Sequence, residues 1–256
     1  MESATQCAML PMKADAMTFQ TLSKQINSIG FKAVIVLILT FILNFVFPLE
    51  APEATQESAI YWLINTEIGY ILGWINQIVS MVSLSAVIAV GTWQVVEDHP
   101  LRAIISWIFN LMATMAFFIV KFINVWSVPL MAKALASGSA ESVNAGAALN
   151  TLAPSVAFGF GPSLDYLGFA LYAVACLVVW RPLLKLSTST KIAAIGFLAF
   201  GLLYLLTLVA PYFDILGQAD IEGWVIASAL PLVIACVALF FRFKEQRNLI
   251  PDAGQE

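Results

Sequence analysis

Six long apolar segments dominate the sequence, and each approaches the length that crosses a lipid bilayer. A helix needs about 20 mostly apolar residues to span the hydrocarbon core. The segments lie near residues 32–48, 68–95, 103–127, 163–181, 190–210 and 222–243. Only 11% of the 256 residues are charged, whereas soluble domains average about 25%. The sequence therefore predicts an all-α fold, in which residues 32–243 form one integral membrane bundle of six transmembrane helices.

The distribution of basic residues predicts how this bundle is oriented. Cytoplasmic segments of membrane proteins are enriched in Lys and Arg. Ten of the twelve basic residues fall on one predicted side: Lys13, Lys24, Lys32, Arg102, Arg181, Lys185, Lys191, Arg242, Lys244 and Arg247. We therefore predict that both termini, including the tail 244–256, are cytoplasmic. Residues 50–66 and 211–221 would face outward. Helical spans are typical of an inner (plasma) membrane.

Two segments outside the predicted spans have helical character. In the cytoplasmic arm 1–31, Phe19, Leu22, Ile26 and Ile29 recur at helical spacing, which predicts a short helix lying on the membrane surface. A frayed arm with chance periodicity is the alternative. The stretch 128–162 is the longest non-spanning segment, and we expect a small helix from Ser142 to Val156. Its low charge indicates burial against the bundle or a neighbouring subunit.

Several classes of protein are disfavoured by composition. The net charge of −4 argues against nucleic acid as a partner. Cys7, Cys176 and Cys236 form no closely spaced pair, and His99 is the only histidine. Neither a disulfide framework nor a metal site is indicated. We expect no bound cofactor, and no catalytic constellation can be assembled from the sequence.

Polar residues inside the third predicted span share one face. Asn110, Thr114, Lys121 and Asn124 recur with Phe117 at intervals of three and four residues. A polar stripe inside a membrane should face protein or a cavity because exposure to lipid is costly. Lys121 lies about 27 Å along the helix from its start at Ala103. That position is close to the outer interface, where the ammonium could reach polar groups.

A matching stripe occurs on the second span. It comprises Gly69, Gly73, Asn76, Ser80 and Ser83, with Gln77 beside it. Small residues allow close helix approach, and the amides and hydroxyls can bond across the contact. Two interpretations stay open: the stripes pack helices together, or they line a polar cavity that opens outward between the second and third spans.

The fourth span supplies a carboxylate on the same side of the membrane as Lys121. The segment Gly159 to Asp165 suits a helix N-terminus, with Pro162 and an acidic residue in the first turn. We predict that Lys121 faces the bundle interior, within reach of Asp165 or the amide of Asn76. If the pair is structural, Lys121→Met should cost little, because interfacial ion pairs are worth about 0–1 kcal/mol.

The tryptophans follow the pattern of interfacial belts. Trp62, Trp126 and Trp224 fall near the predicted outer boundary, and Trp93, Trp107 and Trp180 fall near the inner one. Trp74 lies deeper. Such belts are expected at membrane interfaces and do not indicate a cofactor site.

The layout resembles the bacterial membrane proteins grouped as domain of unknown function 4386. The likeness lies in the turn Glu97-Asp98-His99-Pro100-Leu101, the entry Gly161-Pro162, and the run Ala229-Leu230-Pro231-Leu232-Val233-Ile234. It extends over most of residues 25–243. The resemblance implies six spans with a cytoplasmic N-terminal arm. It implies no activity and no functional residues.

Three functions are compatible with these features. The first is a non-catalytic accessory subunit, or a self-associating protein, that packs against other membrane subunits or copies of itself within the bilayer. It is favoured by the absence of a catalytic set and by the small-residue faces Gly69/Gly73 and Gly196/Gly201. The second is a transporter or channel for a small solute, built around the two polar stripes. The third is a cofactorless lipid-modifying enzyme.

Overall fold

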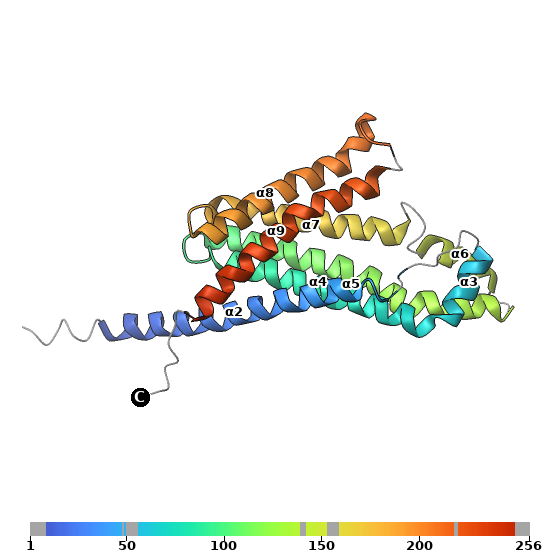
Figure 1. The fold of residues 1–256 in the computed structure, drawn as a ribbon, viewed down its shortest axis with the longest axis horizontal. Helices are drawn as coiled ribbons and strands as arrows, with labels where there is room; N and C mark the ends of the chain where they lie inside the picture. The colour runs from blue at the N-terminus through green and yellow to red at the C-terminus, as the bar shows by residue number, and fades with distance from the viewer. Residues whose placement is uncertain are drawn as a thin grey trace, which may run out of the picture.

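The computed structural model describes residues 9–47, 49, 56–138, 142–152, 159–217 and 220–248. Every regular element in these ranges is helical (Figure 1). The elements are α2 (Met9–Leu43), α3 (Gln56–Asn65), α4 (Glu67–Trp93), α5 (Pro100–Ala136), α6 (Ser142–Leu152), α7 (Phe160–Leu183), α8 (Thr188–Val209), η1 (Ala210–Phe213) and α9 (Ile221–Asn248). Six helices are long and apolar enough to cross a membrane. The predicted all-α membrane fold with six spans is therefore confirmed, by length and composition.

The first span differs from the prediction. We expected a surface helix within residues 1–31 and a span from residue 32, but α2 runs unbroken from Met9 to Leu43, and residues 19–31 are part of its candidate span Phe19–Leu43. The spacing of apolar residues in the arm continues into the span, and Phe19 stacks on Trp93 of α4 at 5.4 Å between ring centroids. Residues 19–31 therefore belong to a packed bundle helix, and they form no separate surface helix. Residues 1–8 lie outside the described part.

Local chemistry sets several of the helix ends. Pro100 occupies the first turn of α5, where its missing N–H is not needed. At the start of α8, the hydroxyl of Ser187 accepts a hydrogen bond from the backbone N–H of Thr190. Such N-caps satisfy a donor that the helix itself cannot. The connections α4–α5 and α7–α8 are short. Both lie at the end of the bundle where the C-terminal turns of α9 are found (Figure 1).

The main core is formed by the central faces of the spanning helices. It contains Val34 of α2, Val87 and Ile88 of α4, Phe117 of α5, Tyr172 of α7, Phe197 and Phe200 of α8, and Leu239 and Phe243 of α9. Each of these side chains is essentially inaccessible to solvent. The exposed apolar side chains lie on the outer surfaces of the same helices, as expected for a bundle whose solvent is lipid.

Close packing of α8 depends on glycine. An added Cβ on Gly196 would lie 2.6 Å from the carbonyl oxygen of Pro231, and one on Gly201 would lie 2.5 Å from Leu177. Both glycines therefore pack against α9 and α7 of the same chain. The small-residue face Gly196/Gly201, from which we argued for self-association, is occupied by the chain's own helices.

A second, smaller core lies at the opposite end of the bundle from the α4–α5 turn. Its buried members are Leu63, Tyr70, Trp74, Val128, Ala132 and Leu149, contributed by α3, α4, α5 and α6. The 37-residue helix α5 is about 55 Å long, well beyond the hydrocarbon core of roughly 30 Å. We call α3, α6 and residues 125–136 of α5 the α3–α6 cap; in Figure 1 it extends beyond the ends of α7 to α9.

The predicted outer helix lies in this cap. It is α6, which runs from Ser142 to Leu152 and buries Ala145 and Leu149. The last predicted residues, 153–156, lie outside the described part. Its low charge is thus explained by packing within the chain.

Candidate functional site: polar contacts inside the bundle

Lys121 of α5 and Asp165 of α7 form an ion pair inside the bundle. The Lys121 ammonium donates to both carboxylate oxygens of Asp165, at 2.7 and 2.6 Å. The Lys121 side chain is 7% exposed and that of Asp165 is 28% exposed. The predicted direction of Lys121 and its pairing with Asp165 are therefore confirmed.

Two aromatic rings complete the surroundings of the ammonium. The Lys121 Nζ lies 5.1 Å from the ring centre of Trp74 and 5.8 Å from that of Phe117. Ring faces attract cations at such distances, more strongly when water is excluded. The indole N–H of Trp74 is buried and has no hydrogen-bond acceptor among the residues that the structure describes. The stripe on α5 therefore places a desolvated cation between one carboxylate and two rings.

The amides near this pair bond to neighbouring helices. Asn124 accepts a hydrogen bond from the hydroxyl of Tyr70 at 2.8 Å, and it donates to its own helix at the carbonyl of Val120. Asn76 does not reach Lys121. Instead its amide donates to the carbonyl of Thr40 on α2 and to the side chain of Asn44, which follows the end of α2, at 2.9 and 2.6 Å. The two stripes thus face different partners.

A second polar cluster lies deeper and centres on Ser85. Its hydroxyl bonds Thr114 of α5 at 2.6 Å and also the hydroxyl of Tyr172 on α7. Tyr172 also donates to the carbonyl of Met81, at 3.2 Å. Asn110 donates to the backbone carbonyl of Ser85 at 3.0 Å. The cluster therefore joins α4, α5 and α7 near the middle of the bundle.

Some of the predicted residues have no interhelical hydrogen bond. Ser80 is buried and Gln77 is half-buried, yet no hydrogen bond involves either side chain within the described residues. The carbonyl oxygen of the Asn110 side chain is buried and finds no hydrogen-bond donor in the described part of the chain. Ser83 bonds its own helix, at the carbonyl of Val79. The structure therefore brings Lys121 to Asp165 and Asn110 and Thr114 to Ser85, but it leaves Gln77 and Ser80 outside these clusters.

The sequence analysis missed a polar junction at the other end of the bundle. The Gln94 amide donates to Asn27 of α2 at 2.9 Å and accepts from the Arg242 guanidinium of α9 at 3.3 Å. Asn27 is 1% exposed. The signal was present, because Asn27 and Gln94 both lie beside apolar helical runs. However, Gln94 lies 67 residues from Asn27 and 148 residues from Arg242 along the chain, so the spacing in the sequence does not pair them.

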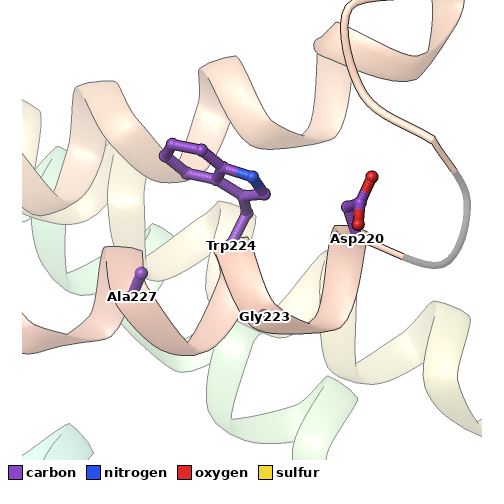
Figure 2. Close-up of a pocket in the computed structure, with 4 residues that line it drawn as sticks. All are labelled: Asp220, Gly223, Trp224 and Ala227. Atoms are coloured by element: carbon purple, nitrogen blue, oxygen red, sulfur yellow. The ribbon is translucent and has the colours of Figure 1, made fainter.

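The described residues include two concave sites, both at the start of α9. One, of about 700 Å³, lies among α7, α8, η1 and α9 and is lined by Ser163, Tyr166, Thr207, Leu208, Val209, Pro211, Tyr212 and Ile221. The other, of about 380 Å³, is lined by Asp220, Gly223, Trp224 and Ala227 (Figure 2). Neither includes a residue of the predicted stripes. Within the described ranges, no group of three or more His, Cys, Asp or Glu side chains could hold a metal ion.

No family model matches the chain, and neither the curated proteins nor the solved structures contain a match. The resemblance to domain of unknown function 4386 is therefore untested and stays a prediction.

Proposed function

We propose that the chain is a non-catalytic membrane protein that acts by contact, as an accessory subunit or as a self-associating protein. The supporting observation is how its polar side chains are used. Asn76, Asn110, Thr114, Lys121, Asn124 and Asp165 all bond to other helices of the same chain. Polar groups that hold helices together in this way are not free to bind a substrate.

The α3–α6 cap supplies a surface for such contact. Its neighbourhood exposes large apolar side chains: Tyr61 is 73% exposed, Ile68 is 76% exposed and Trp126 is 61% exposed. Because α5 is longer than the hydrocarbon core is thick, part of this cap projects beyond the lipid tails. Large exposed aromatic and aliphatic side chains gathered where the cap leaves the lipid tails favour contact with protein.

Site-specific photocrosslinking in membranes tests this proposal. A photoreactive residue at position 61 or 68 should crosslink to a second copy, or to one protein that also co-purifies in fixed ratio. The same residue at the matched control position 104, which is half-exposed on α5 at the other end of the bundle, should label lipid only. Equal protein crosslinking from all three positions, or none from the cap, would contradict the proposal.

A transport function remains the second candidate, because some polar atoms in the two stripes lack partners. Within the described residues, the buried Trp74 indole N–H and the buried Asn110 side-chain carbonyl have no hydrogen-bond partner, and the Gln77 side chain makes no hydrogen bond. All three lie on α4 or α5. If they line a path, Gln77→Leu and Asn110→Leu should abolish solute uptake into proteoliposomes while leaving the fold intact. Under the accessory proposal, neither change affects permeability.

We further propose that both ends of the chain face the cytoplasm across an inner membrane. The support is the ten-to-two split of the basic residues. With the native cysteines replaced, Lys185→Cys should resist an impermeant thiol reagent in intact cells, whereas Tyr61→Cys should react. Labelling of position 185 but not of position 61 would reverse the orientation.

A further inference from the structure

The smaller of the two concave sites lies on one face of the first two turns of α9. Its lining residues, Asp220, Gly223, Trp224 and Ala227, recur at helical spacing and are all exposed. Figure 2 shows Trp224 and Asp220 projecting from the same side of the chain, with the nitrogen edge of the indole turned toward the carboxylate. A Cβ on Gly223 would meet no atom within 4 Å. Because Gly223 and Ala227 are small, the space between the Trp224 ring and the Asp220 carboxylate stays open.

The charge around this site is negative and unbalanced. Asp214, Asp220 and Glu222 lie within nine residues of one another, and residues 192–241 contain no Lys or Arg. No salt bridge in the described part of the chain involves any of the three carboxylates. A positively charged ligand therefore complements the site. An indole face and a carboxylate are the two groups that bind an ammonium best, the first by cation–π attraction and the second by charge.

The site lies where lipid headgroups are found. Asp220 immediately precedes the candidate span Ile221–Asn248, and Trp224 is in its first turn. Trp is enriched at this level of membranes because its ring is apolar and its N–H is polar. Along the same face, the helix continues with exposed apolar side chains: Leu230 is 62% exposed and Ile234 is 57% exposed. A headgroup site therefore leads into a stripe that suits an acyl chain.

We propose that this face of α9 binds a lipid whose headgroup carries an ammonium group. The ammonium lies against the Asp220 carboxylate, and on binding the exposed Trp224 side chain turns the face of its ring toward the ammonium. The acyl chain follows Ala227, Leu230 and Ile234. This inference is independent of the accessory function, because it requires no partner protein and its lining residues do not belong to the α3–α6 cap.

Lipid binding to the purified full chain tests the proposal. Native mass spectrometry in mild detergent would count bound short-chain phosphatidylcholine or phosphatidylethanolamine, against phosphatidylglycerol with the same acyl chains. We expect half-saturation by the ammonium lipids at an approximately tenfold lower concentration. Asp220→Asn should weaken their binding about fivefold, and Trp224→Leu about threefold. Neither change should affect phosphatidylglycerol.

Two controls make the test decisive. Glu222→Gln removes a carboxylate from the same turn without altering the lining of the site, so it should weaken binding of the ammonium lipids less than Asp220→Asn does. Free choline lacks an acyl chain and should not displace the lipid at equal concentration. The proposal would be overturned by equal binding of phosphatidylglycerol to the native chain. Wild-type behaviour of both site variants, or displacement of lipid by equimolar choline, would overturn it as well.

Discussion

The ammonium of Lys121 on α5 bonds both carboxylate oxygens of Asp165 on α7, and the two partners differ in exposure. The lysine side chain is 7% exposed, whereas the aspartate side chain is 28% exposed. An unpaired charge is costly only where water cannot reach it. Removing one partner or the other should therefore have unequal consequences.

Asp165→Asn should destabilise the bundle more than Lys121→Met does. The first change leaves a desolvated ammonium, at a cost of about 3 kcal/mol. The second leaves a carboxylate that is less deeply buried than the lysine, at a cost of about 1 kcal/mol. The free energy of unfolding, measured by denaturant titration in detergent micelles, compares the two. Lys133→Met is the matched control, because the Lys133–Glu67 pair is more exposed, and it should change stability by less than about 1 kcal/mol. Equal losses for the two variants would contradict this asymmetry.

Gly196→Ala should loosen the contact between α8 and α9. Its Cβ would stand 2.6 Å from the backbone oxygen of Pro231 and 2.9 Å from Ala235. A backbone atom cannot rotate away, so the helices must separate, at about 1–3 kcal/mol. Thermal unfolding in micelles measures the effect. Gly223→Ala, whose Cβ would meet nothing within 4 Å, should keep the native midpoint. If both variants lose stability equally, close packing at Gly196 is not the cause.

Tyr172→Phe should cost about 1 kcal/mol of stability. The change removes one hydroxyl from the Ser85 cluster and a hydrogen bond to the carbonyl of Met81. Ser85 retains its bonds to Thr114 and to its own helix, so no buried hydroxyl is left without a partner. Tyr61→Phe serves as the control because Tyr61 is 73% exposed. The difference in unfolding free energy between the two variants isolates the buried bonds, and a difference near zero would show that they contribute nothing.

Gln94→Leu should loosen the junction of α2, α4 and α9. The change removes the hydrogen bonds to Asn27 and Arg242. We expect a loss of local stability of about 1 kcal/mol, which corresponds to roughly fivefold faster local opening. Hydrogen exchange followed by mass spectrometry should show the increase in residues 23–31 and 240–247. Gln20→Leu makes a similar change on an exposed part of α2 and should leave those segments protected. Faster exchange across all helices would instead indicate global destabilisation.

The sequence by itself determined the six spans and the inward direction of Lys121, and it left Asp165 and the amide of Asn76 as the two candidate partners. Apolar run length sets what can cross a bilayer, and helical periodicity alone places Asn110, Thr114, Lys121 and Asn124 on one face. A lysine on such a face has few anionic partners. Asp165 is one of them, and the structure selects it over Asn76, which bonds Thr40 instead.

The tertiary structure decided which helix each remaining polar residue meets. Asn76 bonds α2 and not α5, Ser85 joins Tyr172, and Gln94 joins Asn27 to Arg242. Periodicity fixes a residue's angle around its own helix. It does not fix the rotation, tilt or order of the helices around the bundle, and these depend on side-chain packing such as that of Gly196 on α9. Side-chain packing also explains why α2 is continuous through residue 31. Periodicity alone would allow residues 19–31 to lie on the membrane surface, but Phe19 stacks on Trp93 and packs this segment against α4.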